Sequence, residues 1–126
     1  MKTVTHSAQF CVIGGGMAGL CAALAAARHG VKTIIMQDRP VFGGNASSEI
    51  RMHVCGSPGK DNRETGITEE LFLENFAMNP NLSFSVWDSV LYGKALTQEN
   101  LTFLLNCTCQ KAEVTGGVII PKHIIL

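Results

Sequence analysis

Residues 10–20 read FCVIGGGMAGL, and this stretch decides the fold that the sequence predicts. An apolar run of strand type leads into Gly14, Gly16 and Gly19, which have G-x-G-x-x-G spacing. In a dinucleotide-binding unit the first glycine makes the strand-to-helix turn, the second lets the backbone approach a pyrophosphate, and the third allows close packing of helix on strand. The spacing therefore predicts an anion site at a helix N-terminus, where free N–H groups and the helix dipole favour negative charge.

The sequence after the glycines is typical of the same unit. Residues 17–29 are good helix formers, with Arg28 and His29 in the last turn and Gly30 placed to end the helix. Residues 31–36, VKTIIM, form a β-branched run of strand type. A strand, glycine turn, helix and second strand within about 30 residues are the context that a dinucleotide-binding motif requires. We therefore expect a βαβ core over residues 9–38.

The alternative for this region is a signal peptide or a membrane helix, because residues 10–27 carry no charge. Three consecutive glycines would destabilise such a helix by roughly 1 kcal/mol each relative to alanine. No Trp or Tyr flanks the run, as would be usual at a membrane interface. The nucleotide-binding interpretation is therefore favoured, with no membrane partner.

The residue that binds the cofactor ribose is less clear from the sequence. Dinucleotide-binding folds usually place an acidic residue at the end of the second strand, about 20 residues after the glycines. Gln37 holds that position here, and Asp38 and Arg39 follow it. An amide still accepts a hydrogen bond from a ribose hydroxyl but brings no charge, so ribose binding stays with Gln37 or passes to Asp38. Arg39 is a candidate for contact with adenine or phosphate, against the simpler interpretation of solvated loop charges.

A second glycine pair, Gly43 and Gly44, follows the second strand, where a purely NAD-binding unit has no need of one. In VIGGGMAGLCAALAAARHG and QDRPVFGGNASSEIRMHVCG, the chain resembles FAD-dependent oxidoreductases of the glutathione-reductase structural type. It is most similar to the FAD-dependent oxidoreductase family that includes relatives of heterodisulfide reductase. The resemblance covers about residues 9–117.

This resemblance implies an α/β fold, a Rossmann-like FAD/NAD(P)-binding domain with a parallel sheet, and FAD as the cofactor. It places Gly43, Gly44 and Asn45 beside the diphosphate or the flavin, and the backbone around Cys109 beside the adenine. The alternative for the glycine pair is a plain turn. The expected cofactor-binding residues are Gly14, Gly15, Gly16, Met17, Ala18, Gly19, Gln37, Asp38, Arg39, Gly43, Gly44, Asn45 and Cys109.

Candidate catalytic residues are few. Residues 49–54 alternate polar and apolar side chains, so Arg51 and His53 would share one face of an extended segment. His53 is a candidate proton donor because histidine titrates near neutral pH. Cys55 is a candidate thiol near the flavin, although cysteine more often serves as a small buried residue in the core. The simpler interpretation of the segment is a half-buried strand or loop with a wet polar face.

The cysteines indicate neither a metal site nor a disulfide relay. Cys55 has no second cysteine within thirty residues on either side. The five cysteines contain no C-x-x-C, so the iron–sulfur clusters of some relatives have no evident ligand set here. Cys107 and Cys109 share one face of a predicted strand, where packing is favoured over metal binding.

The remaining chain predicts a helical insertion over 66–96 and a strand with a partial hairpin over 101–120. The helices are expected at 67–78 and 85–96, the second with a capping box from Ser85 and Asp88. A strand is expected over 101–109, followed by a hairpin that starts at Lys111. Residues 39–55 form the expected FAD loop, and residues 56–64 an exposed loop.

Size and charge limit the function. The chain has 126 residues, the usual size of one domain. Its formal net charge is zero, so no overall positive charge favours binding to nucleic acid or acidic membranes. An odd number of cysteines and no convincing signal peptide indicate a reducing cytoplasm. The family's later strands, flavin segment and substrate domain are not recognisable, and residues 118–126 do not resemble its continuation. Residues 1–126 are therefore expected to be the N-terminal portion of an FAD-binding domain that binds FAD poorly alone.

Two functional hypotheses of different classes follow. The first is the FAD-binding part of a flavin-dependent oxidoreductase that transfers two electrons to or from an unknown small molecule or electron partner. The second is a non-catalytic nucleotide-binding fragment or subunit. An NAD-dependent dehydrogenase is a weaker third hypothesis.

Overall fold

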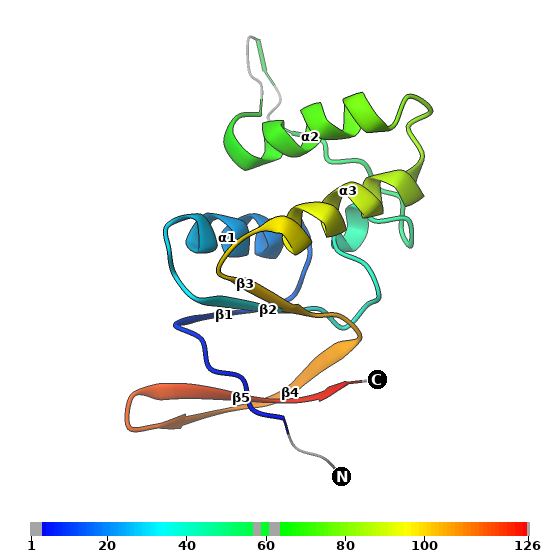
Figure 1. Ribbon diagram of the computed structural model, residues 1–126. Helices are drawn as coiled ribbons and strands as arrows, with labels where there is room; N and C mark the ends of the chain where they lie inside the picture. Colours follow the sequence, from blue (N-terminus) through cyan, green and yellow to red (C-terminus); the bar gives the residue numbers. More distant parts are fainter. Residues whose placement is uncertain (1–3, 57–58, 61–63, 126) are drawn as a thin grey trace.

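The computed structural model describes residues 4–56, 59–60 and 64–125, and their helices and strands lie in three layers (Figure 1). The upper layer is helical, the middle layer is a sheet, and an antiparallel hairpin lies below the sheet. In chain order the elements are β1 (Phe10–Ile13), α1 (Met17–Arg28), β2 (Thr33–Met36), the 3₁₀ turn η1 (Gly44–Ala46), α2 (Gly66–Met78), α3 (Phe84–Thr97), β3 (Leu101–Leu104), β4 (Cys107–Thr115) and β5 (Val118–Ile125). The predicted α/β class is confirmed.

The described part of the sheet is parallel, in the order β1-β2-β3. Met36, the last residue of β2, is paired with Ile13 of β1 and Leu104 of β3, so the three strands end side by side. All four residues of β2 are buried, as expected for a central strand with covered faces. The glycine turn and Gln37 therefore both follow the carboxyl ends of parallel strands, where ligands bind in open α/β sheets.

Helix α1 packs on this sheet through a stripe of small and branched residues, Leu20, Ala23, Leu24 and Ala27. Their spacing is that of one helical face, and the alanines let the helix axis approach the strands. Gly30 has φ +80° and donates its N–H to the carbonyl of Ala27. This left-handed residue ends the helix as predicted, because glycine adopts that conformation without strain.

Helices α2 and α3 form within one or two residues of the predicted ranges, but the predicted capping box is wrong. Helix α3 begins at Phe84, so Ser85 and Asp88 already lie inside it. The Asp88 carboxylate instead accepts a hydrogen bond from the N–H of Ser48 in the loop after β2. Trp87 stacks on Phe72 of α2 with ring centroids 5.9 Å apart, and both belong to the core or pack against it.

The expected single strand over 101–109 is two strands in two different sheets. Asn106 has φ +51°, a left-handed conformation that interrupts an extended chain. Strand β3 ends before it, and β4 begins after it with the N–H of Cys107 donating to the carbonyl of Gln37. The alternation of side chains in the sequence does not reveal this break.

The expectation that the hairpin breaks off is also wrong, because β5 returns along β4 in antiparallel register. Thr115 pairs with Val118 across Gly116 and Gly117, which both have positive φ, as two-residue hairpin turns require. The loop expected over 56–64 lies largely outside the described residues. No described helix is long and apolar enough to span a bilayer.

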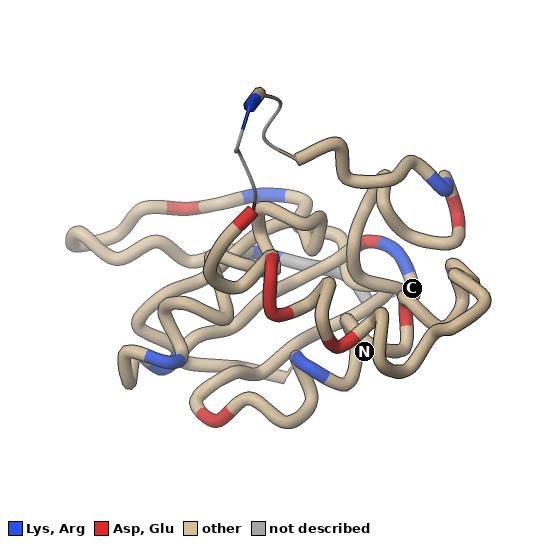
Figure 2. The backbone as a smooth tube through the Cα atoms, turned by 90° about the horizontal axis from the view of Figure 1, so that it is seen from above, with Lys and Arg blue, Asp and Glu red and all other residues tan. Residues whose placement is uncertain are grey.

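An ion-pair cluster joins helices α1, α2 and α3. Elsewhere, positive and negative residues are interspersed along the backbone (Figure 2). Glu70 of α2 accepts hydrogen bonds from Arg28 of α1 at 2.7 Å and Lys94 of α3 at 2.9 Å. Lys94 also pairs with Glu74. The hydrogen bonds from Arg28 and then Lys94 lower the pKa of the Glu70 carboxyl from 4.5 to about 2.

We expect Glu70→Gln to remove a pH-dependent part of the stability. A carboxyl whose pKa is lowered by folding stabilises the protein above its unfolded pKa of 4.5, and this contribution disappears as the pH falls through about 2. Because the Glu70 side chain is 39% exposed, solvent screening limits the loss at pH 7 to about 1 kcal/mol. Urea unfolding at pH 7 and pH 3 measures it. Glu99→Gln, at an exposed position, is the control; equal pH dependence of wild type and Glu70→Gln would contradict the prediction.

Candidate functional site

The first glycine turn joins β1 to the N-terminus of α1. Gly14 has φ +106°, and its N–H donates to the carbonyl of Met36 at 2.8 Å, which ties the turn to β2. Gly16 is the N-cap, and the first helical hydrogen bond runs from the N–H of Leu20 to its carbonyl. The backbone N–H groups of the first turn, including those of Met17 and Ala18, therefore precede the helical hydrogen-bond ladder. The first turn contains no acidic residue, so its positive end can receive an anion.

The three motif glycines meet different surroundings. A methyl group added at Gly19 would lie 1.9 Å from the carbonyl oxygen of Gly14, so the helix could not approach the strand with any side chain there. A methyl group added at Gly14 or Gly16 would meet no atom within 4 Å. The open space above Gly14 and Gly16 is a backbone cradle of the kind that a diphosphate fills, and the residues present fit that group.

Gly15 lies beneath this cradle. It is buried, its N–H donates to Oε1 of Gln37 at 2.8 Å, and its carbonyl accepts from the N–H of Gly43 at 2.8 Å. An added methyl group would lie 2.7 Å from the ring of Phe42. Both backbone polar groups of Gly15 are thus engaged inside the protein, in joining the first glycine turn to the loop after β2.

The second glycine pair lies against the first. Gly43 and Gly44 both have positive φ, +102° and +58°, and lead into η1. A methyl group added at Gly44 would lie 3.1 Å from Cα of Gly16. Asn45 is exposed beside them, and its carbonyl accepts the N–H of Met52. The structure therefore brings together two glycine segments that are about 30 residues apart in the sequence, the separation expected across a βαβ unit.

The Gln37 residue is only 4% exposed, and its side chain connects two backbone segments. Its Oε1 accepts from Gly15, and its Nε2 donates to the carbonyl of Val41 at 3.3 Å. A glutamate at this position would accept the first hydrogen bond but, when ionised, could not donate the second. The amide therefore suits a position that must both accept and donate.

The two residues after Gln37 are more accessible. Asp38 is exposed at the same edge of the sheet. Arg39 Nη1 forms an ion pair with Oε2 of Glu49 at 3.5 Å. This nitrogen atom is buried and makes no hydrogen bond with the described residues. The Arg39 carbonyl accepts the N–H of Asn106. The Arg39–Glu49 ion pair therefore spans the loop that carries the second glycine pair.

The predicted alternation over 49–54 is not present. Arg51 has φ +63°, so the segment is a loop, and its Nε donates to the carbonyl of Ser48. Ile50 and Met52, expected on the covered face, are 48% and 55% exposed. The reason is that the loop leaves the sheet without a neighbouring strand that would impose extended geometry.

The candidate catalytic residues lie on that loop. His53 and Cys55 are both exposed, and the Cys55 Sγ lies 3.9 Å from Nε2 of His53. Arg51 is turned toward the backbone of its own loop, so the three candidates do not share one polar face. The N–H of Arg51 donates to the Ser47 carbonyl of the second glycine segment, while no described hydrogen bond joins His53 or Cys55 to either glycine segment.

The other cysteines mainly pack. Cys107 is 1% exposed, with its Sγ 3.8 Å from Sδ of Met36, and burial raises the pKa of its thiol. Cys109 lies two residues further along β4 and contacts the carbonyl of Lys111 through its Sγ. Within the described ranges, no group of three or more metal-type side chains is close enough to hold an ion.

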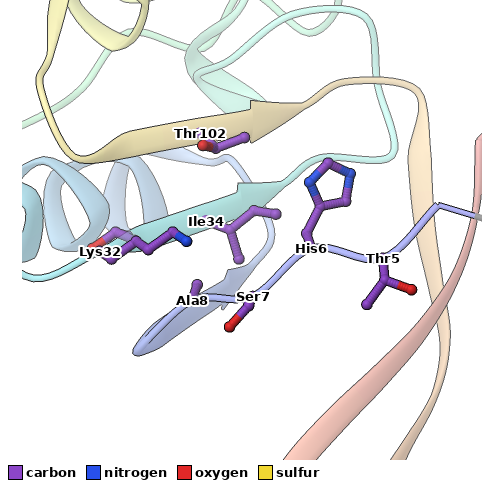
Figure 3. A pocket seen from close by; sticks show the side chains of 8 residues that line it. Thr5, His6, Ser7, Ala8, Lys32, Ile34 and Thr102 are labelled. Atoms are coloured by element: carbon purple, nitrogen blue, oxygen red, sulfur yellow. The ribbon is translucent and has the colours of Figure 1, made fainter.

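A cavity of about 260 Å³ lies between the segment before β1 and strands β2 and β3, and none of the glycines of the candidate site lines it (Figure 3). Its lining comes from residues 5–8, the start of β2 and Thr102 of β3. Because parallel strands bind ligands at their carboxyl ends, this cavity is separate from the candidate site.

Sequence reasoning missed the residues that support the second glycine pair. Phe42, Ser47 and Leu91 are fully buried around it, and Asp88 reaches it from α3. Phe42 and Ser47 lie within the second quoted motif, which gives no signal of this supporting role, and Asp88 and Leu91 lie outside both motifs. The spacing of Asp88 and Leu91, three apart on one helical face, is the one signal in the sequence.

Comparison with known proteins identifies a family. A family model described as FAD dependent oxidoreductase matches residues 9–125. The match includes β5, which corrects the expectation that residues 118–126 do not resemble the family's continuation. No curated protein sequence matches the chain significantly.

Three solved structures share the fold. THI4 of Thermovibrio ammonificans aligns with a TM-score of 0.51 and 19% identity, over 90% of this chain and 45% of that one. For p-nitrophenol 4-monooxygenase PnpA of Pseudomonas putida DLL-E4 the TM-score is 0.53 and the identity 11%, over 90% and 35%. Aklavinone-11 hydroxylase, solved with FAD and aklavinone, has values of 0.52 and 15%, over 96% and 30%. This chain therefore spans less than half the length of these structures.

We expect Gly19→Ala and Gly16→Ala to separate packing from ligand space. Gly19→Ala forces a methyl group against the Gly14 carbonyl and should lower the free energy of unfolding by about 3 kcal/mol. Gly16→Ala meets no atom and should change it by no more than about 0.5 kcal/mol. Urea denaturation followed by circular dichroism measures both. Similar losses for the two variants would contradict this assignment.

We expect Gln37→Glu to destabilise the protein by about 1–2 kcal/mol at pH 7, because the hydrogen bond to the Val41 carbonyl is lost. Burial raises the pKa of an introduced carboxyl, and the protonated acid regains a donor. The difference from wild type in urea unfolding should therefore shrink between pH 7 and pH 5. Gln110→Glu, on an exposed stretch of β4, is the matched control; a loss that does not depend on pH would show that the donor is unimportant.

Proposed function

The chain belongs to the FAD-dependent oxidoreductase family, and on this basis we propose that its two glycine segments bind FAD for a two-electron oxidoreductase. The observation that carries the proposal is the contact between the segments, where Gly44 lies against Gly16. The two glycine turns lie at the carboxyl ends of the parallel strands. Together they form a surface of backbone atoms without side chains. Such a surface lets an extended phosphate-linked cofactor approach closely.

Each part of the site has a proposed role. The N–H groups of Gly16, Met17, Ala18 and Gly19 bind the diphosphate, and Gly14 keeps the turn open. Gly15 acts from beneath, as the junction of the two turns. This assignment is supported by the absence of acidic residues from the first turn of α1, since a carboxylate there would repel the phosphates.

The ribose and adenine end is proposed for the residues after β2. Gln37 offers the second lone pair of Oε1 to a ribose hydroxyl, and exposed Asp38 supplies a second acceptor. Arg39 faces the adenine or a phosphate in place of its long contact with Glu49. The backbone around Cys109 passes the adenine, as in the glutathione-reductase structural type and the relatives of heterodisulfide reductase.

The flavin end is proposed for the second glycine segment. Gly43, Gly44 and Asn45 would lie beside the diphosphate or the flavin, with exposed Asn45 as the polar side chain. Bound FAD would supply the hydride chemistry, while the protein binds and orients it. His53, Arg51 and Cys55 are proposed as catalytic candidates of the loop, with His53 as the proton donor, and a solvated loop is the simpler alternative.

The substrate, the electron partner and the activity of the whole protein are proposals as well. The compared structures include a monooxygenase, of which this chain spans 35%. They also include a hydroxylase that was solved with FAD, of which it spans 30%. We propose that the chain contributes the cofactor-binding part and does not turn over a substrate by itself. A reducing cytoplasm is the proposed location, with no nucleic-acid or membrane partner. The alternatives are a non-catalytic fragment that binds a nucleotide and, with less support, an NAD-dependent dehydrogenase.

Titration of the purified chain with FAD, followed by quenching of flavin fluorescence, tests the proposal. We expect saturable binding that Gly16→Ala weakens at least about tenfold, since its methyl group would occupy the cradle. Gly93→Ala, inside α3 with no atom within 4 Å of an added methyl group, should leave binding unchanged. NAD should bind more weakly than FAD in a thermal-shift assay of the same protein. Preference for NAD, or equal binding by wild type and Gly16→Ala, would contradict the assignment.

Turnover by the isolated chain tests the proposal that it is inactive alone. Both the proposed cofactor-binding part and the non-catalytic alternative would bind FAD without turnover of any electron donor. A stoichiometric yellow complex with turnover would instead show that the described fold is sufficient for catalysis, and would overturn the proposal that this chain is inactive alone.

A further inference from the structure

Helix α3 places a buried carboxylate against the loop that carries the second glycine pair. Asp88 is 8% exposed, and its Oδ1 accepts the N–H of Ser48 at 3.0 Å, across 40 residues of sequence. Within the described residues this backbone N–H is its hydrogen-bond partner. Burying a carboxylate is unfavourable unless a specific interaction compensates for it. Packing alone would be served better by an apolar residue, so the hydrogen bond to the loop is the feature to explain.

The loop that Asp88 holds is a closed turn. The N–H of Ala46 donates to the carbonyl of Gly43 at 3.0 Å, and Oγ of fully buried Ser47 donates to the carbonyl of Gly44 at 2.7 Å. Ser48 ends this turn, and the N–H groups of Glu49 and Arg51 donate hydrogen bonds back to Ser47. Those bonds stay within the loop, whereas the hydrogen bond from Ser48 to Asp88 joins the end of the turn to α3.

Leu91, one helical turn beyond Asp88, contacts the start of the same loop. A methyl group added at Gly43 would lie 2.8 Å from Cδ1 of Leu91. Asp88 and Leu91 share one face of α3, so one rigid helix holds the loop at both ends. The first glycine turn has its own hydrogen bond to the sheet, from Gly14 to Met36, in addition to the bond that joins Gly15 to Gly43.

From this arrangement we infer that Asp88 is a positioning residue, which holds the turn over residues 43–48 against Gly16 and so sets the width of the cofactor cradle. The inference rests on the proposed function for its ligand. Asp88 acts through the loop and contacts no cofactor atom. Because Asp88 and Leu91 contact the second glycine segment directly, loss of the Asp88 acceptor should affect binding of the flavin half of FAD more than binding of the adenosine half.

The test compares Asp88→Leu, Asp88→Ala and Asp88→Asn with Ser89→Ala, a neighbouring exposed position whose Oγ bonds within α3. Leucine keeps the buried volume without an acceptor, and so remains informative if the alanine variant does not fold. Asparagine keeps an oxygen that accepts the same hydrogen bond. The measurements are the Kd for FAD, the Kd for AMP and the hydrogen-exchange rate of the Ser48 amide.

We expect Asp88→Leu to weaken FAD binding about tenfold, which corresponds to the loss of one such hydrogen bond, and to change AMP binding less than about twofold. Exchange of the Ser48 amide should accelerate in Asp88→Leu and return toward the wild-type rate in Asp88→Asn. Ser89→Ala should match wild type throughout. Equal weakening of FAD and AMP binding, or failure of asparagine to restore either property, would overturn the inference.

The exchange measurement separates this inference from the proposed function. If wild type binds neither FAD nor AMP, the proposed function is contradicted, and the Ser48 amide still reports on the loop. Faster exchange in Asp88→Leu than in Asp88→Asn would then support the positioning role of Asp88. Equal exchange in the two variants would overturn it whether or not FAD binds.

Discussion

The two hydrogen bonds of Gly15 are the interaction on which the arrangement of the candidate site depends. Its N–H is bound by the Gln37 side chain and its carbonyl by the N–H of Gly43, both at 2.8 Å. Through them the first glycine turn, the end of β2 and the second glycine segment become one unit. The groups are buried, where an unmatched partner would destabilise the protein, so the geometry of the unit is strongly specified. The open surface above Gly14 and Gly16 is the consequence.

The supporting helices explain why this surface can consist of backbone. Helix α1 approaches β1 closely because Gly19 has no side chain, and α3 presses Leu91 against Gly43. Neither glycine has a side chain, so both leave room at positions where added bulk would separate the layers. The charged cluster around Glu70 then joins α1, α2 and α3 on their solvent side. Apolar packing and the ion pairs thus act on opposite sides of the same helices.

Much of the fold could be predicted from the sequence, because the signals were local. The glycine spacing, the alanine-rich helix ended by Gly30 and the β-branched second strand each specify a short segment, and the structure contains all three. The failures were at places where neighbours decide the conformation. The strand expected over 101–109 breaks at Asn106, the alternating segment at 49–54 has no neighbouring strand, and Asp88 serves a distant loop instead of its own helix end.

The sequence by itself determined the βαβ unit, the glycine turn at a helix N-terminus and the resemblance to FAD-dependent oxidoreductases. These follow from backbone preferences and hydrophobic periodicity, which act within about 30 residues. Only the tertiary structure decided that Gly15 serves as a junction, that Gln37 is needed as both acceptor and donor, and that Asp88 and Leu91 hold the second glycine turn. Apart from the bond of Gln37 to Val41, four residues away, those roles depend on contacts between segments 22 to 48 residues apart. A hydrogen bond or a close approach across such a separation leaves no periodic pattern in the sequence.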